Sequence, residues 1–396
     1  MLQAALTEDC LLDDAYLYSF DATVRAVYPC NEGVALVLDR TAFFPEGGGQ
    51  SSDVGTVAGF AVTDVQSTAR GVEHTVRAQP TAFSVGQTVH GEVDRARRFD
   101  AMQCHTAEHI LSGLIHTHYG LDNVGFHLGR EEMTMDISGV LDEAALDRIE
   151  HLANRAVYEN VPVTVSYPTE EQLATLPYRA KLPLSGRVRI VTVEGVDICA
   201  CCAPHVAFTG EIGLIKLLAA EKHRGGMRLY VAAGERAFLH VQREHRELHR
   251  SSTLLSVHPI ELSAAIGRVQ EELKRTSLLY KSTLCEHMRA LGERFSSEDE
   301  NPVVCFPDTP TEAVRAFLNA ARGRVRGVLV ALTPRAAGGF DFLLASDSTD
   351  LRAHIATVRD ALSGRGGGSA QMMQGSLGAD EDAIRDFFKN TKFVNN

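Results

Sequence analysis

The sequence predicts a multidomain α+β protein, and three observations support this prediction. Its 396 residues suffice for two to four domains of about 100–200 residues each. The hydrophobic pattern changes near residue 96 from short strand-like runs to helical spacing. A polar, helix-like stretch then separates this region from a mixed tail. Because 44 % of the residues are hydrophobic and 23 % are charged, the composition excludes wholesale disorder.

Residues 1–95 are predicted to form a β-barrel subdomain. Short apolar runs, such as 34–38 and 62–65, are separated by Gly, Asp, Asn or Pro, which favour turns. Many short strands at this spacing are typical of a small barrel or sandwich. The same region contains a glycine-rich motif, TAFFPEGGGQ, at 41–50. It is not a P-loop, because no Lys-Ser/Thr follows, and taken alone it predicts a tight hairpin.

Residues 96–232 are predicted to form an α+β domain that binds zinc, for reasons given below. Apolar side chains at helical spacing predict a first helix that ends near Gly120, and Asp142 is expected to begin a second helix. Strand-like runs follow at 163–165 and 188–193. Helices and strands mixed in this way indicate an α+β unit.

The last two regions are predicted to differ from each other. Residues 235–293 lack strand signals and repeat leucines at helical intervals, which predicts a helical hairpin of coiled-coil type. The same pattern is typical of a plain spacer or an oligomerisation arm. Residues 300–396 are predicted to form a small α/β domain with a glycine-rich segment at 363–375.

Charge and cysteine usage restrict the class of protein. A formal net charge of −12 argues against binding nucleic acid by bulk charge alone, although a local basic surface remains compatible with it. No apolar run approaches the ~18 residues of a membrane span, and the first residues lack the features of a secretory signal. Three of the eight cysteines crowd into 199–202, which favours metal binding in a reducing cytoplasm over a disulfide framework. We therefore expect a cytoplasmic protein with no membrane partner.

Two pairs of metal-binding side chains are each spaced four residues apart. They are His105 with His109 in the predicted first helix, and Cys201 with His205 in a loop after a predicted strand. Two histidines at this spacing share one helix face and can reach one ion. Three imidazoles and one thiolate complete the four-coordinate set that zinc favours, so one Zn²⁺ ion is predicted. Spacing alone does not choose between Cys201 and the competing thiols of Cys199 and Cys202.

The string His105-x-x-Glu108-His109 also matches the H-x-x-E-H pattern of inverzincin peptidases, in which the glutamate is the general base. A zinc peptidase normally takes a carboxylate as third ligand and keeps one position open for water. The downstream candidates Cys201 and His205 fit that design poorly. A zinc metallopeptidase is therefore kept only as an alternative.

Four motifs in this order resemble the editing domain of alanyl-tRNA synthetase. They are the 41–50 motif, Val93-Asp-x-x-Arg-Arg98, His105-x-x-x-His109, and Cys201-x-x-x-His205-x-x-x-Thr209-Gly-Glu-Ile-Gly213. They are still more similar to the freestanding alanyl-tRNA editing proteins, the AlaX group, in its long form. The 363–375 segment resembles the glycine-rich C-terminal domain of the synthetase, which is also known as the DHH-associated domain. The resemblance covers residues from about 20 to 232 and this tail.

This resemblance implies a zinc-dependent trans-editing hydrolase that deacylates alanine tRNA mischarged with serine or glycine. It implies zinc-ligand roles for His105, His109, Cys201 and His205, and pocket roles for Thr41 and Gln50, with His127 as a further pocket candidate. The chain departs from the family at the usual Cys-Gly-Gly-Thr-His, which is here Cys201-Cys-Ala-Pro-His205. Glu108 also replaces a commoner small or polar residue, and we assign it no catalytic role.

Contacts with tRNA are expected at three clusters. They are Arg95, Arg97 and Arg98 before the first helix; Lys222, Arg224 and Arg228 near the end of the editing domain; and Arg365, Gly366, Gly367 and Gly368 in the tail. A non-catalytic tRNA-binding or synthetase-associated module is the other alternative function. A homodimer formed through the hairpin or the C-terminal domain is a further expectation.

Overall fold

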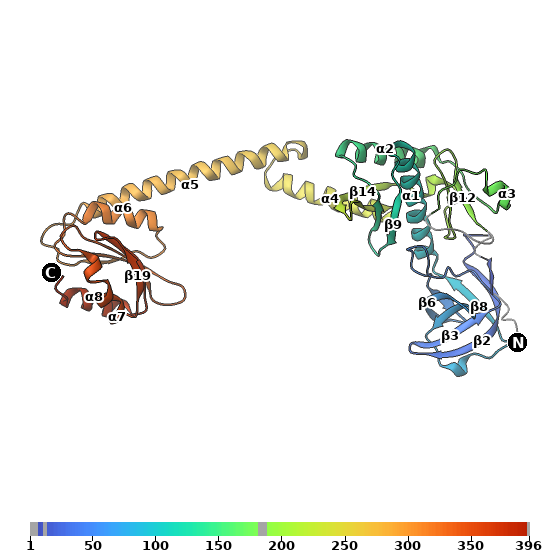
Figure 1. Ribbon diagram of the computed structural model, residues 1–396, viewed down its shortest axis with the longest axis horizontal. Coiled ribbons are helices and arrows are strands. Elements are labelled where there is room, and N and C mark those ends of the chain that lie inside the picture. Colours follow the sequence, from blue (N-terminus) through green and yellow to red (C-terminus); the bar gives the residue numbers. More distant parts are fainter. Residues whose placement is uncertain (1–6, 11–13, 181–187, 394–396) are drawn as a thin grey trace. The chain divides into compact units, whose positions relative to one another are not determined.

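The chain folds into two compact units, residues 1–250 and residues 251–396. The structure is a computed structural model that describes residues 7–10, 14–180 and 188–393 (Figure 1). The fold is a mixed α+β arrangement of several domains. The finer division into the four predicted parts stays a prediction. Within the described ranges, none of the helices combines the length and the apolar character that a membrane span requires.

A closed six-stranded barrel forms the N-terminal part of the first unit, which confirms the predicted barrel. Its strand order is β2-β3-β7-β6-β5-β8 and its pairs are antiparallel. The strands are β2 (Ser19–Cys30), β3 (Gly33–Leu38), β5 (Gly55–Val57), β6 (Phe60–Thr68), β7 (Gly71–Val76) and β8 (Thr88–Val93), and the short β1 (Glu8–Asp9) pairs with β4 (Arg40–Thr41). Apolar side chains that alternate along the strands fill the interior.

One polar pair lies inside this apolar barrel. His74 and Thr41 are both fully buried, and the Thr41 hydroxyl lies 2.8 Å from Nε2 of His74. On the other side of the ring, Nδ1 lies 3.2 Å from the carbonyl oxygen of Leu36. A carbonyl only accepts, so Nδ1 bears the hydrogen and the Thr41 hydroxyl donates to Nε2. Burial lowers the pKa of His74 to about 4, which keeps the ring neutral at pH 7.

The buried His74 predicts a loss of stability at acidic pH. The unfolded chain binds a proton at His74 near its ordinary pKa of 6.5, whereas the folded barrel does so only near a pKa of about 4. The contribution of His74 to the free energy of unfolding is therefore fully present above pH 6.5. It is lost as the pH falls from 6.5 to 4, and the loss amounts to about 3 kcal/mol. Urea unfolding at pH 7 and pH 4.5 measures the change. His74→Gln should lose less stability between these pH values than the wild type; an equal loss in both proteins would contradict the neutral, buried His74.

The long helix α1 (Arg95–Tyr119) begins directly after the barrel, whose strands lie beside its N-terminal end (Figure 1). The Asp94 side chain accepts a hydrogen bond from the backbone N–H of Arg97 and caps the helix start. Gly120 ends the helix at a φ of 64°, where the sequence predicted the end. The second helix, α2 (Glu143–Glu159), is capped by Asp142, also as predicted.

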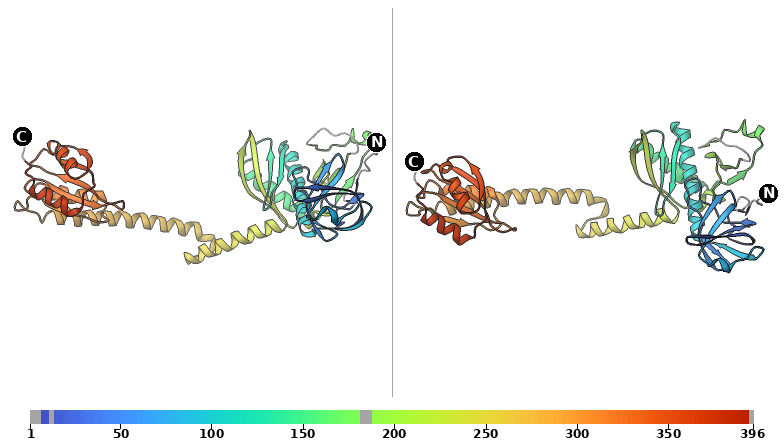
Figure 2. Two further views of the ribbon diagram at one scale, coloured as in Figure 1. Left: turned by 90° about the horizontal axis from the view of Figure 1, so that it is seen from below. Right: turned by 60° about the horizontal axis from the view of Figure 1, so that its bottom comes forward.

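Two antiparallel sheets also belong to the first unit. A four-stranded sheet of order β14-β15-β10-β9 lies alongside α1 (Figure 2), and a three-stranded sheet has the order β11-β12-β13. The strands are β9 (Asn123–Leu128), β10 (Met133–Ile137), β14 (Ile215–His223) and β15 (Gly226–Ala233) in the first sheet, and β11 (Val163–Ser166), β12 (Ile190–Val193) and β13 (Asp197–Ala200) in the second. The short α3 (Glu170–Leu173) follows β11. Apolar side chains from α1, α2 and the larger sheet form the main core of this unit.

Two glycines permit the close contacts that bring distant segments to α1. Gly49, in the glycine-rich motif, has a φ of +85°, and a Cβ there would lie 2.2 Å from the carbonyl oxygen of Phe126. The motif therefore docks on β9. In α1, a Cβ on Gly113 would lie 2.6 Å from the carbonyl oxygen of Val196, so this glycine admits the start of β13.

The chain from residue 235 onward forms two long helices and then a five-stranded sheet with shorter helices. Helices α4 (Glu235–Leu254) and α5 (Leu262–Gly292) lie in the predicted helical stretch; their pairing as a hairpin stays a prediction. The sheet has the order β16-β17-β18-β20-β19. Its strands are β16 (Val303–Cys305), β17 (Leu329–Pro334), β18 (Phe340–Ala345), β19 (Arg365–Gly368) and β20 (Met372–Leu377), accompanied by α6 (Thr311–Ala321), α7 (Ile355–Ala361) and α8 (Glu381–Asn390). The identification of this part as a DHH-associated domain also stays a prediction.

Candidate metal centre

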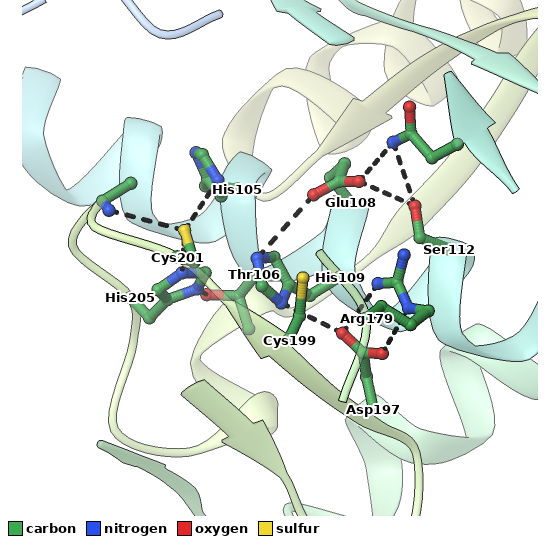
Figure 3. A network of polar contacts seen from close by, with 12 residues as sticks. His105, Thr106, Glu108, His109, Ser112, Arg179, Asp197, Cys199, Cys201 and His205 are labelled. Carbon is green, nitrogen blue, oxygen red and sulfur yellow. Dashed lines mark hydrogen bonds and ion pairs between the residues drawn. The ribbon is translucent and has the colours of Figure 1, made fainter. Parts of the chain in front are cut away.

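The four predicted zinc ligands, which are separated by up to 100 residues in the sequence, come together in one cluster. One ligand atom from each of His105, His109, Cys201 and His205 lies within 4.8 Å of all the others. The first two project from α1, and the other two lie in the loop after β13 (Figure 3). The Cys201 sulfur lies 3.4 Å from Nε2 of His105 and 3.4 Å from Nε2 of His205. Tetrahedral zinc with ordinary bond lengths places sulfur and nitrogen ligands about 3.6 Å apart, so the donor set fits this ion.

Two of the histidines are held in the tautomer that a metal requires. Nδ1 of His105 lies 2.9 Å from Oε1 of Gln50, which only accepts, so Nδ1 bears the hydrogen and Nε2 keeps its lone pair. Nδ1 of His205 lies 3.1 Å from the Thr106 hydroxyl. Since that hydroxyl donates its hydrogen to the carbonyl oxygen of Met102 at 2.8 Å, it accepts from His205. Partners of this kind on the second ring nitrogen are typical of metal-bound histidines.

The third histidine is oriented by a carboxylate. Nδ1 of His109 lies 3.1 Å from Oδ2 of Asp197, and Arg179 donates to both oxygens of Asp197 at 2.7 and 2.8 Å. Burial opposes ionisation of Asp197, but its contacts with His109 and Arg179 lower its pKa below the ordinary value. His109, Asp197 and Cys199 form a second group with metal-ligand chemistry. Because Arg179 already neutralises the carboxylate, this group is better suited to orient His109 than to hold a second ion.

The structure distinguishes between the neighbouring cysteines. The Cys201 sulfur faces His105 and His205 and also accepts a hydrogen bond from the backbone N–H of Ala203 at 3.4 Å. Burial opposes ionisation of this thiol, but the nearby imidazoles hold its pKa well below the usual range. Cys202, in contrast, is exposed. This geometry favours Cys201 as the thiolate ligand.

Glu108, the general base of the peptidase alternative, lies in a buried polar group. Its Oε1 accepts hydrogen bonds from the Ser112 hydroxyl at 2.7 Å and from the Asn123 amide. Its Oε2 lies 3.9 Å from Nε2 of His109. A peptidase base must face a water in an open metal position. Here four side chains form the donor set and Glu108 is 2 % exposed, which disfavours the peptidase.

Of the three predicted pocket residues, only Gln50 contacts the cluster. Its Nε2 is buried and has no hydrogen-bond partner among the described residues, so the amide offers a donor beside His105. Thr41 lies in the barrel interior, where its hydroxyl contacts His74 and accepts from the backbone N–H of Phe43. His127 is exposed on β9.

The prediction that Arg98 contacts RNA is wrong, because its guanidinium is completely enclosed. It forms a buried ion pair with Asp53, its Nη1 donates to the carbonyl oxygen of Ala15, and its Nη2 donates to that of Ala42. Arg98 thus fastens the glycine-rich region to the start of α1. The charge of a side chain is visible in the sequence, but the direction in which it points depends on contacts made 45 and more residues away.

The other predicted RNA contacts lie in varied surroundings. Arg97, Lys222 and Arg224 are exposed, whereas Arg228 donates to both oxygens of Asp136 at 2.7 and 2.8 Å. Arg95 is also exposed, and its guanidinium lies 5.5 Å from the centroid of the Tyr18 ring. In the tail, Arg365, Gly366, Gly367 and Gly368 form β19 at the edge of the sheet. Their contacts with RNA stay predictions.

Comparison with protein-family models gives two matches. Residues 16–97 match the family of class II (A) tRNA synthetases, and residues 188–230 match the threonyl and alanyl tRNA synthetase second additional domain. The second match contains Cys201 and His205, and the first contains the barrel strands and Gln50.

The individual proteins with similar sequences include an alanyl-tRNA editing protein and alanine–tRNA ligases. The alanyl-tRNA editing protein Aarsd1 of Danio rerio is 26 % identical over 382 residues, which cover 91 % of this chain and 92 % of that protein. An alanine–tRNA ligase of Halobacterium salinarum is 32 % identical over 363 residues, and one of Thermococcus kodakarensis is 35 % identical over 282 residues. The aligned parts cover 85 % and 68 % of this chain, but only 38 % and 30 % of the two ligases.

Proposed function

Because the chain is related in sequence to an alanyl-tRNA editing protein and to alanine–tRNA ligases, we propose that it is a hydrolase that deacylates mischarged alanine tRNA. The substrate is the seryl ester, and the glycyl ester is a second substrate. The observation that supports this proposal most strongly is the cluster of His105, His109, Cys201 and His205 with the donor of Gln50 beside it. The protein would act in the cytoplasm with tRNA as its partner.

The four clustered side chains would hold one zinc ion in this proposal. When bound, zinc would supply a positive charge that keeps these four side chains together beside the proposed pocket. Because four protein ligands complete the usual shell of a structural zinc site, we assign the ion an anchoring role. Gln50, Thr106 and Asp197 keep the three imidazoles in the orientation that coordination needs.

The aminoacyl ester is already activated, so the protein must position a water and stabilise the negative charge that develops on the carbonyl oxygen. We propose that the Nε2 group of Gln50 donates to the side-chain hydroxyl oxygen of the seryl ester. A buried donor without an acceptor costs about 1–3 kcal/mol, which a serine hydroxyl can relieve and an alanine methyl group cannot. The same donor would therefore support discrimination between the seryl and alanyl esters.

Gln50→Glu tests this role, because it keeps an oxygen for His105 but replaces the free N–H donor with an acceptor. The variant should keep its zinc while its rate constant for seryl-tRNA deacylation falls about 10- to 100-fold, which corresponds to the loss of one such buried hydrogen bond. Gln79→Glu adds the same charge at an exposed position and should leave the rate unchanged. Deacylation by Gln50→Glu at the wild-type rate would remove Gln50 from the mechanism.

One experiment separates the proposed hydrolase from both alternatives. The protein is incubated with seryl-charged alanine tRNA, and free serine is followed with and without a zinc chelator. The hydrolase releases serine, and prolonged chelation removes this activity. A non-catalytic binding module would retain the tRNA without releasing serine. A metallopeptidase would instead cleave peptides, and Glu108→Gln would abolish that cleavage.

A further inference from the structure

Arg189 lies directly behind the turn that contains Cys201, and no sequence motif singled it out. It precedes β12 and is 6 % exposed. Its Nη1 donates to two backbone carbonyl oxygens of the turn, that of Cys201 at 2.8 Å and that of Ala203 at 2.9 Å. Its own carbonyl oxygen accepts from the backbone N–H of Cys201 at 3.1 Å. Three hydrogen bonds thus connect one residue to the backbone around the thiolate ligand.

The surroundings of this arginine are unusual for a buried cation. Among the described residues no carboxylate forms an ion pair with Arg189, and its Nε has no hydrogen-bond partner. Arg98 and Arg179, which are also buried or nearly so, each contact an aspartate. Burying a guanidinium without a counter-ion is costly, so such a residue needs another reason to be retained. In this structure its Nη1 group donates to the two carbonyl oxygens of the Cys201 turn.

We propose that Arg189 is a positioning residue of the metal centre, which fixes the Cys201–Ala203 turn in the conformation that presents the thiolate to the ion. This inference rests on the proposed zinc site. The backbone N–H of Ala203 donates to the Cys201 sulfur, and that N–H is held in place by the same turn. Without the guanidinium, the two carbonyl groups lose their shared donor, and the turn can adopt more conformations in the metal-free chain. Zinc binding must then order the turn, which costs conformational entropy and weakens the affinity. Zinc affinity, rather than folding, is therefore the property that Arg189 controls.

The test measures zinc affinity by competition with a chromophoric chelator for the full chain and its variants. Arg189→Met should weaken zinc binding about 10- to 100-fold, the usual effect of removing an outer-shell partner. Arg189→Lys keeps one charged donor for the two carbonyls and should recover part of that loss. Cobalt(II)-loaded Arg189→Met should show altered d–d and thiolate charge-transfer bands, because the sulfur is displaced.

Arg236→Met is the matched control. Like Arg189, Arg236 donates from Nη1 to a backbone carbonyl oxygen, that of Gly129. It also forms an ion pair with Asp100, outside the metal-binding cluster. It should lower stability while leaving the zinc dissociation constant within about twofold of the wild type. A dissociation constant for Arg189→Met within twofold of the wild type overturns the inference about Arg189 alone, and so does an equal weakening by Arg236→Met. If Arg189→Met does not fold, Arg189→Lys provides the test. A wild-type zinc affinity and an unchanged cobalt(II) spectrum in that variant would overturn the inference about Arg189. A wild-type chain that binds no zinc overturns the metal centre itself.

Discussion

Cys201→Ala should remove the zinc ion and with it the deacylase activity. The Cys201 sulfur is the only thiolate in the four-residue cluster, and it lies 3.4 Å from the Nε2 atoms of His105 and His205. Loss of a direct ligand should exceed the about 10- to 100-fold loss of affinity that follows removal of an outer-shell partner. Zinc content after dialysis should fall from one ion per chain to a small fraction, and seryl-tRNA deacylation should fall at least 100-fold, by the same comparison.

Cys202→Ala is the control for this substitution, because Cys202 adjoins Cys201 but is exposed. It should keep both the zinc and the activity. Retention of zinc in Cys201→Ala together with its loss in Cys202→Ala would show that the ligand assignment is displaced by one residue. Metal analysis by mass spectrometry on both purified variants settles the point without an activity assay.

Arg98→Met should lower the free energy of unfolding by about 3–5 kcal/mol, because it leaves the Asp53 carboxylate buried without its counter-ion. The change also removes the donors for the carbonyl oxygens of Ala15 and Ala42. Since these contacts join the glycine-rich region to α1, some loss of zinc affinity should accompany the loss of stability. Urea unfolding followed by far-UV circular dichroism measures the difference; the chain has no tryptophan to report it.

Arg97→Met is the control, because Arg97 adjoins Arg98 in the sequence but is exposed. It removes the same charge as Arg98→Met without disturbing a buried ion pair. Its free energy of unfolding should stay within about 0.5 kcal/mol of the wild type. The double variant Arg98→Met/Asp53→Leu should be less destabilised than Arg98→Met alone, because no unpaired carboxylate remains. A stability of Arg98→Met equal to that of Arg97→Met would show that the buried ion pair does not hold these segments together.

Local chemistry explains which features were predictable from the sequence. Alternating apolar residues specify the barrel strands, and cap residues mark helix ends, as Asp142 and Gly120 do. The spacing of four residues places His105 and His109 on one face of a helix before any tertiary contact is considered. A second such pair with a thiolate then supplies a complete zinc donor set, which the structure gathers in one place.

Features that depend on distant contacts were not predictable in this way. Asp197, in β13, and Arg189, just before β12, orient the ligands in this account, but nothing in their local sequence distinguishes them from their neighbours. Thr106 lies between the two helical histidines, yet its role requires His205, which is 99 residues away. Thr41 was placed in the pocket by resemblance, whereas its hydroxyl contacts His74, 33 residues further along the chain. Only the tertiary structure shows such pairings.

Single-turnover deacylation of alanine tRNA charged in parallel with serine and with alanine tests the proposed function most directly. The release of each amino acid is followed with the zinc-loaded wild-type chain in excess over tRNA, under identical salt. We expect the rate constant for the seryl ester to exceed that for the alanyl ester by at least about 10-fold, because only serine has the hydroxyl that a polar pocket can bind. Equal rate constants for the two esters, or no release of either, would contradict the proposal that this protein edits mischarged alanine tRNA.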